Sequence, residues 1–473
     1  MVTEHVDVAI IGGGPAGQLA ATTASAAGQR TVLIEQEPHA GGECVRRGTI
    51  PSKTLRETAL AVSAFRAKSG GVVEVSLGTD VQLESLMRRK TEVIDAHHAF
   101  IADELRLCDV EVWHGRARFS SPHELEVISV AGGKRVLHAK VVLIATGSRP
   151  RTPPDVPIDH EHLLDSDSIL SMAWLPKSLT VLGSGVIASE YASIFAALGV
   201  TVTMIDRAAR PVAFLDEELT SAFSAAFSAT GSRFVGGRKT VEVSWNGVDA
   251  VETRLDNGEV VRSEKLLCAL GRVANVEALR LEAAGLSTNA RGLIAVDANL
   301  RTPVEHIYAV GDVIGPPSLA STSMEQGRRA IRHWLGLPIG PGPELIPAGV
   351  YTIPEMSSVG LTEAQAKEQH GTVVVGRARF DRLARGQISG APNGLLKLVC
   401  DASGTLLLGV HVVGEGAAEL VHLGQLALSA RLPIDTFVDD IFNFPTMAEA
   451  YRVAALDIVR QRTRRETERA SAA

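Results

Sequence analysis

The chain has 473 residues, enough for about three domains that each have a core of their own, so a small disulfide scaffold is excluded. Hydrophobic residues make up 45% of the chain and charged residues 21%, which argues against a mainly disordered protein. The formal net charge is −7 without a block of basic residues, so nucleic acid is not an expected partner.

Neither a membrane anchor nor an export signal is expected. The sequence contains no run of about 18 apolar residues, and its N-terminus lacks the layout of a signal peptide. The cysteines lie far apart without the spacing of metal ligands: Cys44, Cys108, Cys268 and Cys400. We therefore expect a cytoplasmic protein with no metal site and no structural disulfide.

The chain begins with one βαβ unit. An apolar strand is expected over Val6–Ile11, followed by a helix over Gln18–Ala27 and a second strand over Thr31–Glu35. Three glycines in the pattern G-x-G-x-x-G follow the first strand: Gly12, Gly14 and Gly17. This order of strand, glycines and helix is typical of a dinucleotide-binding unit.

Each residue of this pattern has a physical role in binding a dinucleotide. The first glycine permits a tight turn, the second lets the backbone approach a pyrophosphate, and the third lets helix and strand pack closely. Glu35 follows at roughly the 20-residue distance typical of the acid that accepts hydrogen bonds from a ribose. A glycine-rich turn alone is a common feature, but here all parts of the unit appear in order.

A second copy of the unit begins at a strand expected over Leu179–Leu182. Its three turn positions are Gly183, Gly185 and Ala188. A helix to about Leu198 and a strand over Val202–Asp206 complete it. Asp206 suits the 2′-hydroxyl of NAD(H), whereas Arg207 and Arg210 suit the 2′-phosphate of NADP(H), so both nucleotides are expected and the preference between them stays open. Alternatively, Asp206 selects NAD and the two arginines are only solvated.

Further strands indicate how the chain is divided. Buried strands ending in a turn are expected at Val141–Gly147 and Leu266–Arg272, each closing one nucleotide-binding domain. Beyond the proline-rich stretch Pro338–Pro343, a separate α+β domain is predicted. Its expected strands are Thr372–Phe380, Leu395–Cys400 and Leu406–Val413.

The segment Gly41–Lys53 resembles the active-site segment of the flavoprotein disulfide reductases, the family of dihydrolipoamide dehydrogenase and glutathione reductase. That family has a cysteine, four residues and a second cysteine, whereas here Thr49 stands in the second position after Cys44. The family's C-terminal His-x-His-Pro-Thr motif is also altered, with Phe444 at the catalytic histidine. Both departures imply that the disulfide relay is absent while hydride transfer to flavin remains, and that Cys44 packs against the flavin.

Further stretches resemble one branch of this family, the Si-specific pyridine nucleotide transhydrogenases, and the likeness spans nearly the whole chain. They are residues 165–172, 190–195, 351–355 and 444–456. The resemblance implies an FAD-containing homodimer or higher homo-oligomer in which NADPH reduces the flavin, leaves, and is replaced by NAD⁺ in the same pocket. An FAD-dependent NAD(P)H diaphorase or quinone reductase is the alternative, and a non-catalytic nucleotide-binding protein is a rival of another class.

The resemblance also assigns site residues. Lys53 and Glu190 match a catalytic pair beside flavin N5, where a positive charge stabilises the reduced ring. Asp312 matches the acid that accepts hydrogen bonds from the ribityl chain, and a helix beginning near Ala320 and Ser321 points its N-terminus at the flavin. The full set of expected cofactor-binding residues is Gly12, Gly14, Gly17, Glu35, Gln36, Gly41, Gly42, Cys44, Lys53, Thr146, Gly147, Gly311, Asp312, Ala320, Gly183, Gly185, Ala188, Asp206, Arg207, Arg210 and Gly271.

The expected fold class is α/β, with two Rossmann-like dinucleotide-binding domains and a C-terminal α+β dimerisation domain. The expected boundaries are 1–149 and 273–338 for the two parts of the FAD-binding domain, 150–272 for the NAD(P)-binding domain, and 339–460 for the dimerisation domain. Residues 461–473 are charged and small, without an apolar face, so we expect a flexible tail there.

Overall fold

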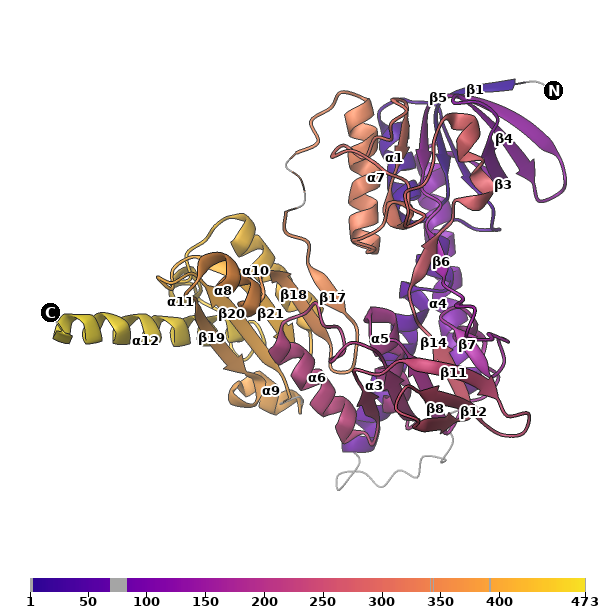
Figure 1. Ribbon diagram of the computed structural model, residues 1–473. Coiled ribbons are helices and arrows are strands. Elements are labelled where there is room, and N and C mark those ends of the chain that lie inside the picture. Colours follow the sequence, from indigo (N-terminus) through magenta and orange to yellow (C-terminus); the bar gives the residue numbers. More distant parts are fainter. Residues whose placement is uncertain (1–2, 69–82, 341, 343, 391–392, 473) are drawn as a thin grey trace. The chain divides into compact units, whose positions relative to one another are not determined.

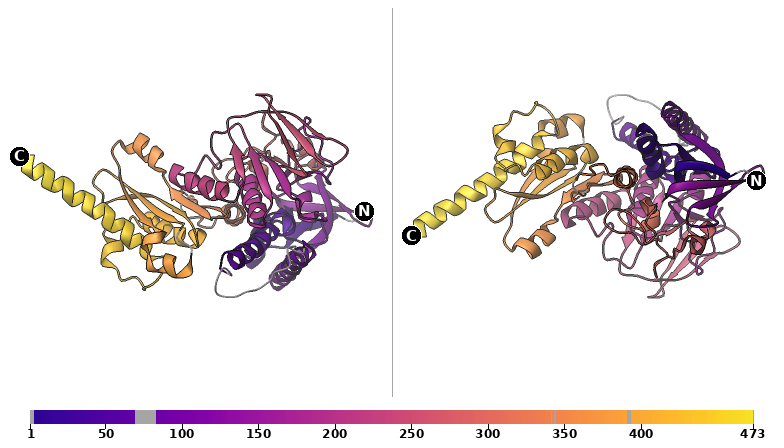
Figure 2. Two further views of the ribbon diagram at one scale, coloured as in Figure 1. Left: turned by 90° about the horizontal axis from the view of Figure 1, so that it is seen from below. Right: turned by 90° about the horizontal axis from the view of Figure 1, so that it is seen from above.

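The computed structural model describes residues 3–68, 83–340, 342, 344–390 and 393–472. The chain forms two compact units, each made of three separate stretches of sequence (Figures 1 and 2). The first unit comprises Met1–Thr54, Gln82–Arg151 and Leu270–Gly342, and the second comprises Leu55–Val81, Thr152–Ala269 and Pro343–Ala473. Because the chain returns to the first unit twice, neither unit is a continuous segment.

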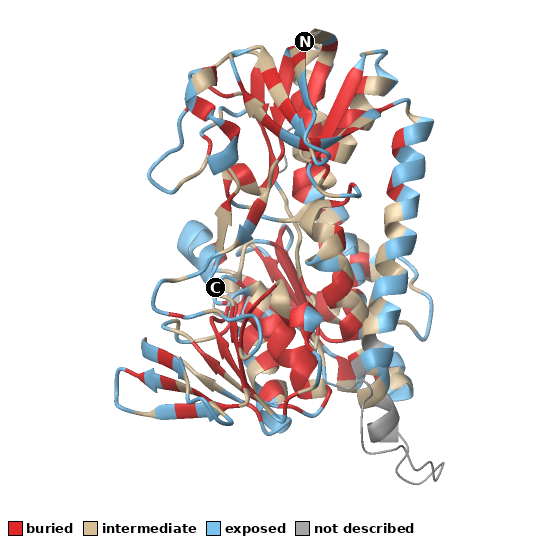
Figure 3. Ribbon diagram, turned by 90° about the vertical axis from the view of Figure 1, so that its right-hand side faces the viewer, coloured by how far each residue is buried: buried red, intermediate tan, exposed pale blue. Residues whose placement is uncertain are grey.

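The first unit is built on a six-stranded sheet with the order β1-β2-β3-β4-β5-β16, in which β1 also pairs with β5. Its strands are β1 (Thr3–Ile11), β2 (Thr31–Glu35), β3 (Glu111–Phe119), β4 (Glu124–Ser129), β5 (Lys134–Ile144) and β16 (Ile307–Ala309). The pairs β1–β2, β1–β5, β2–β3 and β5–β16 are parallel, and β4 is antiparallel to both neighbours. Strands β2 and β16 and the end of β5 are buried (Figure 3), as expected of parallel strands that are covered on both faces, whereas β3 and β4 alternate between buried and more exposed residues.

Helices cover this sheet. They are α1 (Pro15–Ala26), α2 (Gly42–Arg46), α4 (Leu83–Leu107) and α7 (Ala320–Trp334), with short 3₁₀ turns at Glu277–Leu279, Leu281–Ala284 and Gly311–Ile314. Helices α1 and α7 pack side by side (Figure 1). This close contact depends on Gly327, because a Cβ there would overlap the carbonyl oxygen of Ala16. A two-stranded ribbon of β6 (Ser148–Pro150) and β15 (Arg272–Ala274) completes the unit.

The middle of the second unit contains a five-stranded parallel sheet with the order β10-β9-β8-β14-β7. Its strands are β7 (Leu163–Asp165), β8 (Ser178–Leu182), β9 (Thr201–Ile205), β10 (Arg233–Val235) and β14 (Lys265–Cys268). A three-stranded antiparallel sheet accompanies it: β11 (Thr240–Trp245), β12 (Val251–Leu255) and β13 (Val260–Ser263). The helical segments of this part are α5 (Val186–Ala197), α6 (Glu217–Ala229) and a 3₁₀ turn at Ser168–Ser171.

The C-terminal part of the second unit is a five-stranded antiparallel sheet with the order β17-β18-β21-β20-β19. Its strands are β17 (Ala348–Val350), β18 (Met356–Gly360), β19 (Val374–Arg379), β20 (Leu395–Cys400) and β21 (Leu407–Val413). Its helices are α8 (Glu363–His370), α9 (Ala384–Ser389), α10 (Ala417–Ser429), α11 (Thr436–Asp439) and α12 (Glu449–Ala472), with a 3₁₀ turn at Phe380–Arg382. Two parallel-sheet modules and this α+β region confirm the expected fold class.

The structure differs from the expected boundaries in three places. The expected NAD(P)-binding and dimerisation domains lie in one compact unit. Residues 461–472, expected as a flexible tail, continue helix α12, and Arg462 there pairs with Asp435 at 2.6 Å while Gln461 donates to the carbonyl oxygen of Val375. Helix α3 (Thr49–Lys68) belongs from Leu55 onward to the second unit. The reason is Arg56, whose Nη2 lies 2.9 Å from Glu355 Oε2 and whose Nε donates to the carbonyl oxygen of Thr352.

Other bounds shift by a few residues, while β2 and β20 begin and end as predicted. Within the proline-rich stretch Pro338–Pro343, residues 341 and 343 lie outside the described residues. Among the residues that are described, no helix is both long enough and apolar enough to cross a membrane.

Candidate functional site

The first glycine turn joins β1 to α1 and leaves no room for a Cβ atom at Gly12 or Gly17. Gly12 has φ +108°, and a Cβ there would overlap the carbonyl oxygen of Ala145. A Cβ on Gly17 would overlap the carbonyl oxygen of Gly12. Gly14 is the N-cap of α1, so the first backbone N–H groups of this helix have no intrahelical acceptors. The turn therefore presents a backbone surface suited to a phosphate.

Glu35 ends β2 beside this turn, as predicted. The residue is only 5% exposed, and its two carboxylate oxygens accept hydrogen bonds from the backbone N–H groups of Gly13 at 2.8 Å and Glu37 at 3.0 Å. Each oxygen keeps a second lone pair, so the carboxylate can still accept hydrogen bonds from ribose hydroxyls. Gln36, the next residue, is exposed.

A second backbone segment crosses the first turn. Gly41 has φ +144°, and its N–H donates to the carbonyl oxygen of Gly13 at 2.8 Å. A Cβ on Gly42 would lie 2.7 Å from the Cα of Gly14, closer than real Cβ atoms approach. Glycine backbone thus lines both sides of a cradle that a side chain would fill. This arrangement fits the pyrophosphate of a dinucleotide cofactor.

Cys44 follows on α2 and is half-buried. Burial raises the pKa of its thiol, while a hydrogen bond with Thr49 and the charge of Lys53 offset part of that rise. The thiolate is the nucleophilic form of cysteine, so a raised pKa makes Cys44 a poor nucleophile at neutral pH. Thr49, which stands at the position of the second cysteine in the flavoprotein disulfide reductases, is thus a neighbour of Cys44. Lys53 lies on α3, with its Nζ 3.5 Å from Ser52 Oγ.

Asp312 is held by a small polar network in the first unit. Its Oδ2 accepts a hydrogen bond from Ser148 Oγ at 2.6 Å, and Arg272 Nε donates to the same hydroxyl at 2.7 Å. Arg272 Nη2 also donates to the carbonyl oxygen of Ser148 at 2.7 Å. The N–H of Gly311 donates to Gln326 Oε1 at 2.7 Å, which ties the turn before Asp312 to helix α7. The predicted acid is therefore present and oriented by neighbours.

Thr146 and Gly147 lie at the end of β5, as expected. Asn275 bridges them, because its side-chain amide donates to the carbonyl oxygen of Thr146 and its own N–H donates to that of Gly147, both at 3.0 Å. Thr146 Oγ1 donates back to the carbonyl oxygen of Asn275 at 2.7 Å. Ala320 is the first residue of α7. This helix start carries unpaired N–H groups, which suits the negative side of a bound ring.

Sequence reasoning missed the residues that orient this site: Ser148, Arg272, Asn275 and Gln326. None of them belongs to a recognised motif, and each acts through a partner that is distant in sequence. The one available signal was the position of Arg272, which follows the predicted Gly271 directly.

The second glycine turn has the same arrangement as the first but leaves more space around its residues. Gly183 has φ +106°, and a Cβ there would lie 2.6 Å from the carbonyl oxygen of Ala269. Gly185 is the N-cap of α5, and Ala188 is fully buried. Gly271, with φ +102°, lies in the first unit just after Leu270. The backbone of this second turn is therefore also suited to a phosphate, and its role as a nucleotide site stays a prediction.

The charged residues that follow β9 differ in whether they face solvent or bind other parts of the protein. Asp206 is partly exposed, and its Oδ1 accepts a hydrogen bond from the N–H of Ala208 at 2.8 Å. Arg207 is exposed. Arg210 is instead engaged within the protein, since its Nη1 donates to Thr220 Oγ1 at 2.6 Å and its Nη2 to the carbonyl oxygen of Ala213 at 2.9 Å. Of the two predicted arginines, Arg207 is exposed, whereas the guanidinium of Arg210 is engaged in hydrogen bonds within the protein.

The predicted catalytic pair is divided between the units. Lys53 lies in the first unit and Glu190 in the second, so their pairing stays a prediction. Glu190 is 5% exposed, and its Oε1 accepts a hydrogen bond from the N–H of Tyr351 at 2.9 Å. Ser193, one turn later on α5, accepts from the N–H of Ile353 at 3.0 Å. Glu190 and Ser193 thereby fasten α5 to the C-terminal part of the same unit.

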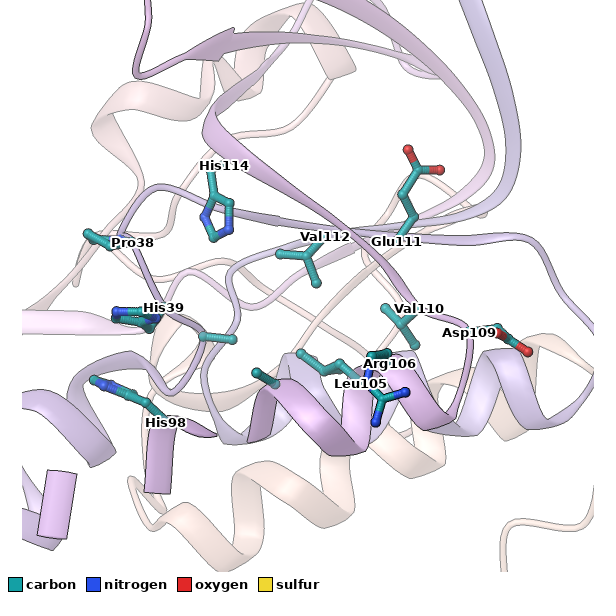
Figure 4. A pocket seen from close by; sticks show the side chains of 12 residues that line it. Pro38, His39, His98, Leu105, Arg106, Asp109, Val110, Glu111, Val112 and His114 are labelled. Carbon is teal, nitrogen blue, oxygen red and sulfur yellow. The ribbon is translucent and has the colours of Figure 1, made fainter. Parts of the chain in front are cut away.

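A cavity of about 480 Å³ lies between α4 and β3 in the first unit (Figure 4). His39 and His98 stack beside it with ring centroids 4.9 Å apart. Its lining includes none of the predicted cofactor-binding residues. Within the described part of the chain, no group of three or more His, Cys, Asp or Glu side chains is arranged to hold a metal ion.

Comparisons with known proteins agree with this arrangement. The sequence pattern of the pyridine nucleotide-disulphide oxidoreductases matches residues 6–327, and that of their dimerisation domain matches residues 346–455. A soluble pyridine nucleotide transhydrogenase of a Marinomonas species is 39% identical over 97% of this chain and 99% of its own, and one of Marinobacter nauticus is 40% identical over the same shares. The crystal structure of LpdA from Mycobacterium tuberculosis superposes with a TM-score of 0.88, at 27% identity over 96% of this chain and 99% of LpdA.

Proposed function

The chain belongs to the pyridine nucleotide-disulphide oxidoreductase family, and we propose that it is an FAD-dependent enzyme that transfers hydride between NADPH and NAD⁺. Its family implies a flavin and a pyridine nucleotide, and the relatives that share about 40% of its sequence over nearly the full length are named soluble pyridine nucleotide transhydrogenases. The observation that separates this activity from disulfide reduction is Thr49 beside Cys44. A hydroxyl group cannot form or resolve a disulfide, so the thiol route to a substrate lacks its second sulfur.

FAD is the flavin that the first glycine turn fits. Glu35 would accept hydrogen bonds from the adenosine ribose, and the N-terminus of α1 would face the pyrophosphate between Gly14 and Gly42. Asp312, oriented by Ser148, would accept a hydroxyl hydrogen bond from the chain that carries the ring. When bound, FAD supplies the hydride acceptor and donor.

The protein's contribution to this reaction is positioning. Nicotinamide C4 must lie close to flavin N5 in a site that excludes water and oxygen, and no side-chain acid or base is required. Lys53 would place a positive charge beside the flavin, and its pairing with Glu190 remains what the family resemblance implies. Asp206 and Arg207 would hold the adenosine end of the nucleotide, so NADPH and NAD⁺ would use one pocket in turn with ping-pong kinetics.

We infer that the enzyme works as a homodimer or a larger homo-oligomer, in which the region matched to the dimerisation domain meets its partner. Four large apolar residues of this region are at least 66% exposed in the chain: Ile441 at 95%, Phe444 at 72%, Leu426 at 68% and Ile388 at 66%. Where such side chains lie together, they form the kind of apolar patch that another subunit covers.

The test is an anaerobic assay of the purified yellow protein with NADPH and thio-NAD⁺ and no other acceptor. We expect rapid formation of thio-NADH that disappears when the flavin is removed and returns when FAD is added back. If NADPH bleaches the flavin but thio-NAD⁺ is not reduced, the enzyme is a diaphorase or quinone reductase instead. A colourless protein that NADPH leaves unchanged would favour a non-catalytic nucleotide-binding protein.

A further inference from the structure

The loop from Asp206 to Asp216 joins β9 to α6 and crosses the second glycine turn. The N–H of Val212 donates to the carbonyl oxygen of Ser184, the middle residue of that turn, at 2.8 Å. Val212 has φ +46°, a conformation that β-branched residues rarely adopt, and its side chain is buried with 2% exposure. The loop is therefore held in one path by forces strong enough to offset an unfavourable backbone.

Arg210 braces this loop from within. Its Nη1 donates to the carbonyl oxygen of Leu215 at 3.2 Å and to Thr220 Oγ1 at 2.6 Å, and its Nη2 donates to the carbonyl oxygen of Ala213 at 2.9 Å. All three acceptors lie at the far end of the loop or in the first turn of α6. A guanidinium with three donors engaged in this way links the segment that carries Arg207 to the start of α6.

The far end of the loop is anchored in a buried ion cluster. Lys397, on β20, lies 2.9 and 3.1 Å from the two carboxylate oxygens of Asp216, and 2.7 Å from both Glu218 and Glu363. The side chains of Lys397 and Asp216 are 2% and 3% exposed. Burial lowers the pKa of Lys397, but the surrounding carboxylates outweigh it and hold the pKa above its usual value. The lysine is therefore charged at neutral pH.

This cluster joins two parts of the second unit. Asp216 is the N-cap of α6 and accepts from the N–H of Glu218, while it also accepts from the N–H of Glu363, the first residue of α8. Arg377 of β19 adds a contact of 2.6 Å to Glu218. The start of α6 is thus fastened to β19, β20 and α8, which lie within the region matched to the dimerisation domain.

We propose that Arg210 and Lys397 are positioning residues for nucleotide choice, which fix the loop so that Arg207 meets the 2′-phosphate of NADP(H). This inference rests on the proposed function, because it assigns the nucleotide to the second glycine turn. Its physical basis is that a guanidinium binds phosphate through a rigid fork of donors, so a displaced backbone costs more for NADPH than for NADH. The region matched to the dimerisation domain then takes part in selecting the nucleotide.

The experiment compares the ratio of kcat/KM for NADPH to kcat/KM for NADH, measured as anaerobic flavin reduction in the holoenzyme. The variants are Arg210→Ala, Thr220→Val and Lys397→Met, each made in the wild-type chain and in Arg207→Ala. We expect each to lower the ratio in the wild-type background, by about tenfold for Arg210→Ala, the size of coupling seen between contacting residues. In the Arg207→Ala background the same changes should leave the ratio unaltered, because the group that they position is gone.

Lys367→Met is the matched control for the lysine. Lys367 also contacts Glu363, at 2.6 Å, but its side chain is 58% exposed, whereas that of Lys397 is 2% exposed. We expect the nucleotide ratio to be unchanged in this variant. Thr220→Val removes an acceptor of Arg210 without changing any charge, so it decides the question if Lys397→Met fails to fold.

Two results would overturn the inference. One is an equal loss of kcat/KM for NADPH and for NADH in Arg210→Ala and Thr220→Val. This would show that the two residues have a structural role only. The other is a selective loss that persists in the Arg207→Ala background. Equilibrium binding of NADP⁺ and NAD⁺ to the oxidised holoenzyme separates this inference from the proposed function. Variants that change the binding ratio while no hydride reaches thio-NAD⁺ would refute the transhydrogenase activity and leave the positioning role standing.

Discussion

The turn at Gly12–Gly17 and the turn at Gly183–Ala188 share one arrangement but differ in how closely it is packed. In both, a crossing segment donates a backbone N–H to the middle residue of the turn, from Gly41 to Gly13 and from Val212 to Ser184. In the first turn, the crossing residue Gly41 and the third glycine of the pattern, Gly17, have no space for a Cβ atom. In the second turn the corresponding residues are Val212 and Ala188, which bury their side chains.

The acidic residues that follow the two turns, Glu35 and Asp206, also differ in how tightly they are held. Glu35 is buried with both oxygens held by backbone N–H groups, whereas Asp206 is partly exposed and holds the N–H of Ala208 with one oxygen. A tightly constrained site loses little further freedom on binding, which suits a cofactor that stays bound. A looser and more exposed site suits a nucleotide that must enter and leave in every cycle. Three pairs of substitutions at corresponding positions, and one substitution in the second site alone, test this difference.

The largest effect is expected from Gly17→Ala. Its Cβ would overlap the backbone oxygen of Gly12, so helix α1 would have to move away from β1. We expect a cost of at least about 3 kcal/mol, the upper end for overpacked sites, together with loss of bound flavin. Flavin absorbance per chain and the thermal unfolding temperature measure both.

The control is the reverse change at the corresponding residue of the second turn, Ala188→Gly. It adds backbone freedom and removes one buried methyl group, so the expected cost is about 1–2 kcal/mol with full flavin content. A Gly17→Ala protein that retained its flavin and its unfolding temperature would contradict the assignment of the first turn as the tighter one.

Next in size is Glu35→Gln. The amide nitrogen would face one of the two backbone N–H groups, leaving a buried donor without an acceptor at a cost of about 1–3 kcal/mol. We expect faster loss of flavin on dilution, measured by the rise of free-flavin fluorescence. Asp206→Asn, as the control, should retain flavin and raise KM for NADH. Equal flavin loss in both variants would argue against two separate roles.

Arg207→Ala should have a more selective effect. Loss of a charge-assisted hydrogen bond to the 2′-phosphate should reduce binding of NADPH by about 1–2 kcal/mol while NADH is affected less. The KM values for both nucleotides measure this. Arg262→Ala removes another exposed arginine of the same unit, one that pairs with Glu252 at 2.8 Å, and should change neither value. Equal effects of Arg207→Ala on both nucleotides would refute the assignment.

The smallest effect is expected from Val212→Gly. Loss of a buried apolar side chain costs about 1.5–3 kcal/mol, and release of the positive φ returns about 1–3 kcal/mol, so the two effects nearly cancel. The unfolding temperature should therefore change little. Gly41→Ala, at the corresponding position of the first turn, should lower it clearly, because its Cβ would lie 2.8 Å from the Cβ of Val45. Similar unfolding temperatures for the two variants would show that the crossing segments are alike.

Much of the first site could be predicted because its signals are local. Gly12, Gly14, Gly17 and Glu35 all lie within one βαβ unit, where the glycine pattern and the strand ends determine their places. Residues 461–472, for which a flexible tail was expected, are helical in the structure, because α12 continues to Ala472 with contacts such as Arg462 with Asp435. Such contacts have no periodic pattern in the sequence.

The sequence by itself determined the fold class, the two dinucleotide-binding units, and the residue types at each turn and strand end. It did so because tight turns, buried strands and helix starts each restrict the local choice of residue. Only the tertiary structure decided what Arg210 does. Sequence placed it with Arg207 as a phosphate ligand, and the fold turns it toward Thr220 and the carbonyl oxygens of Ala213 and Leu215. Which partners a long side chain meets depends on the path of a folded loop, and that path depends here on Lys397, 181 residues away from Asp216 in the chain.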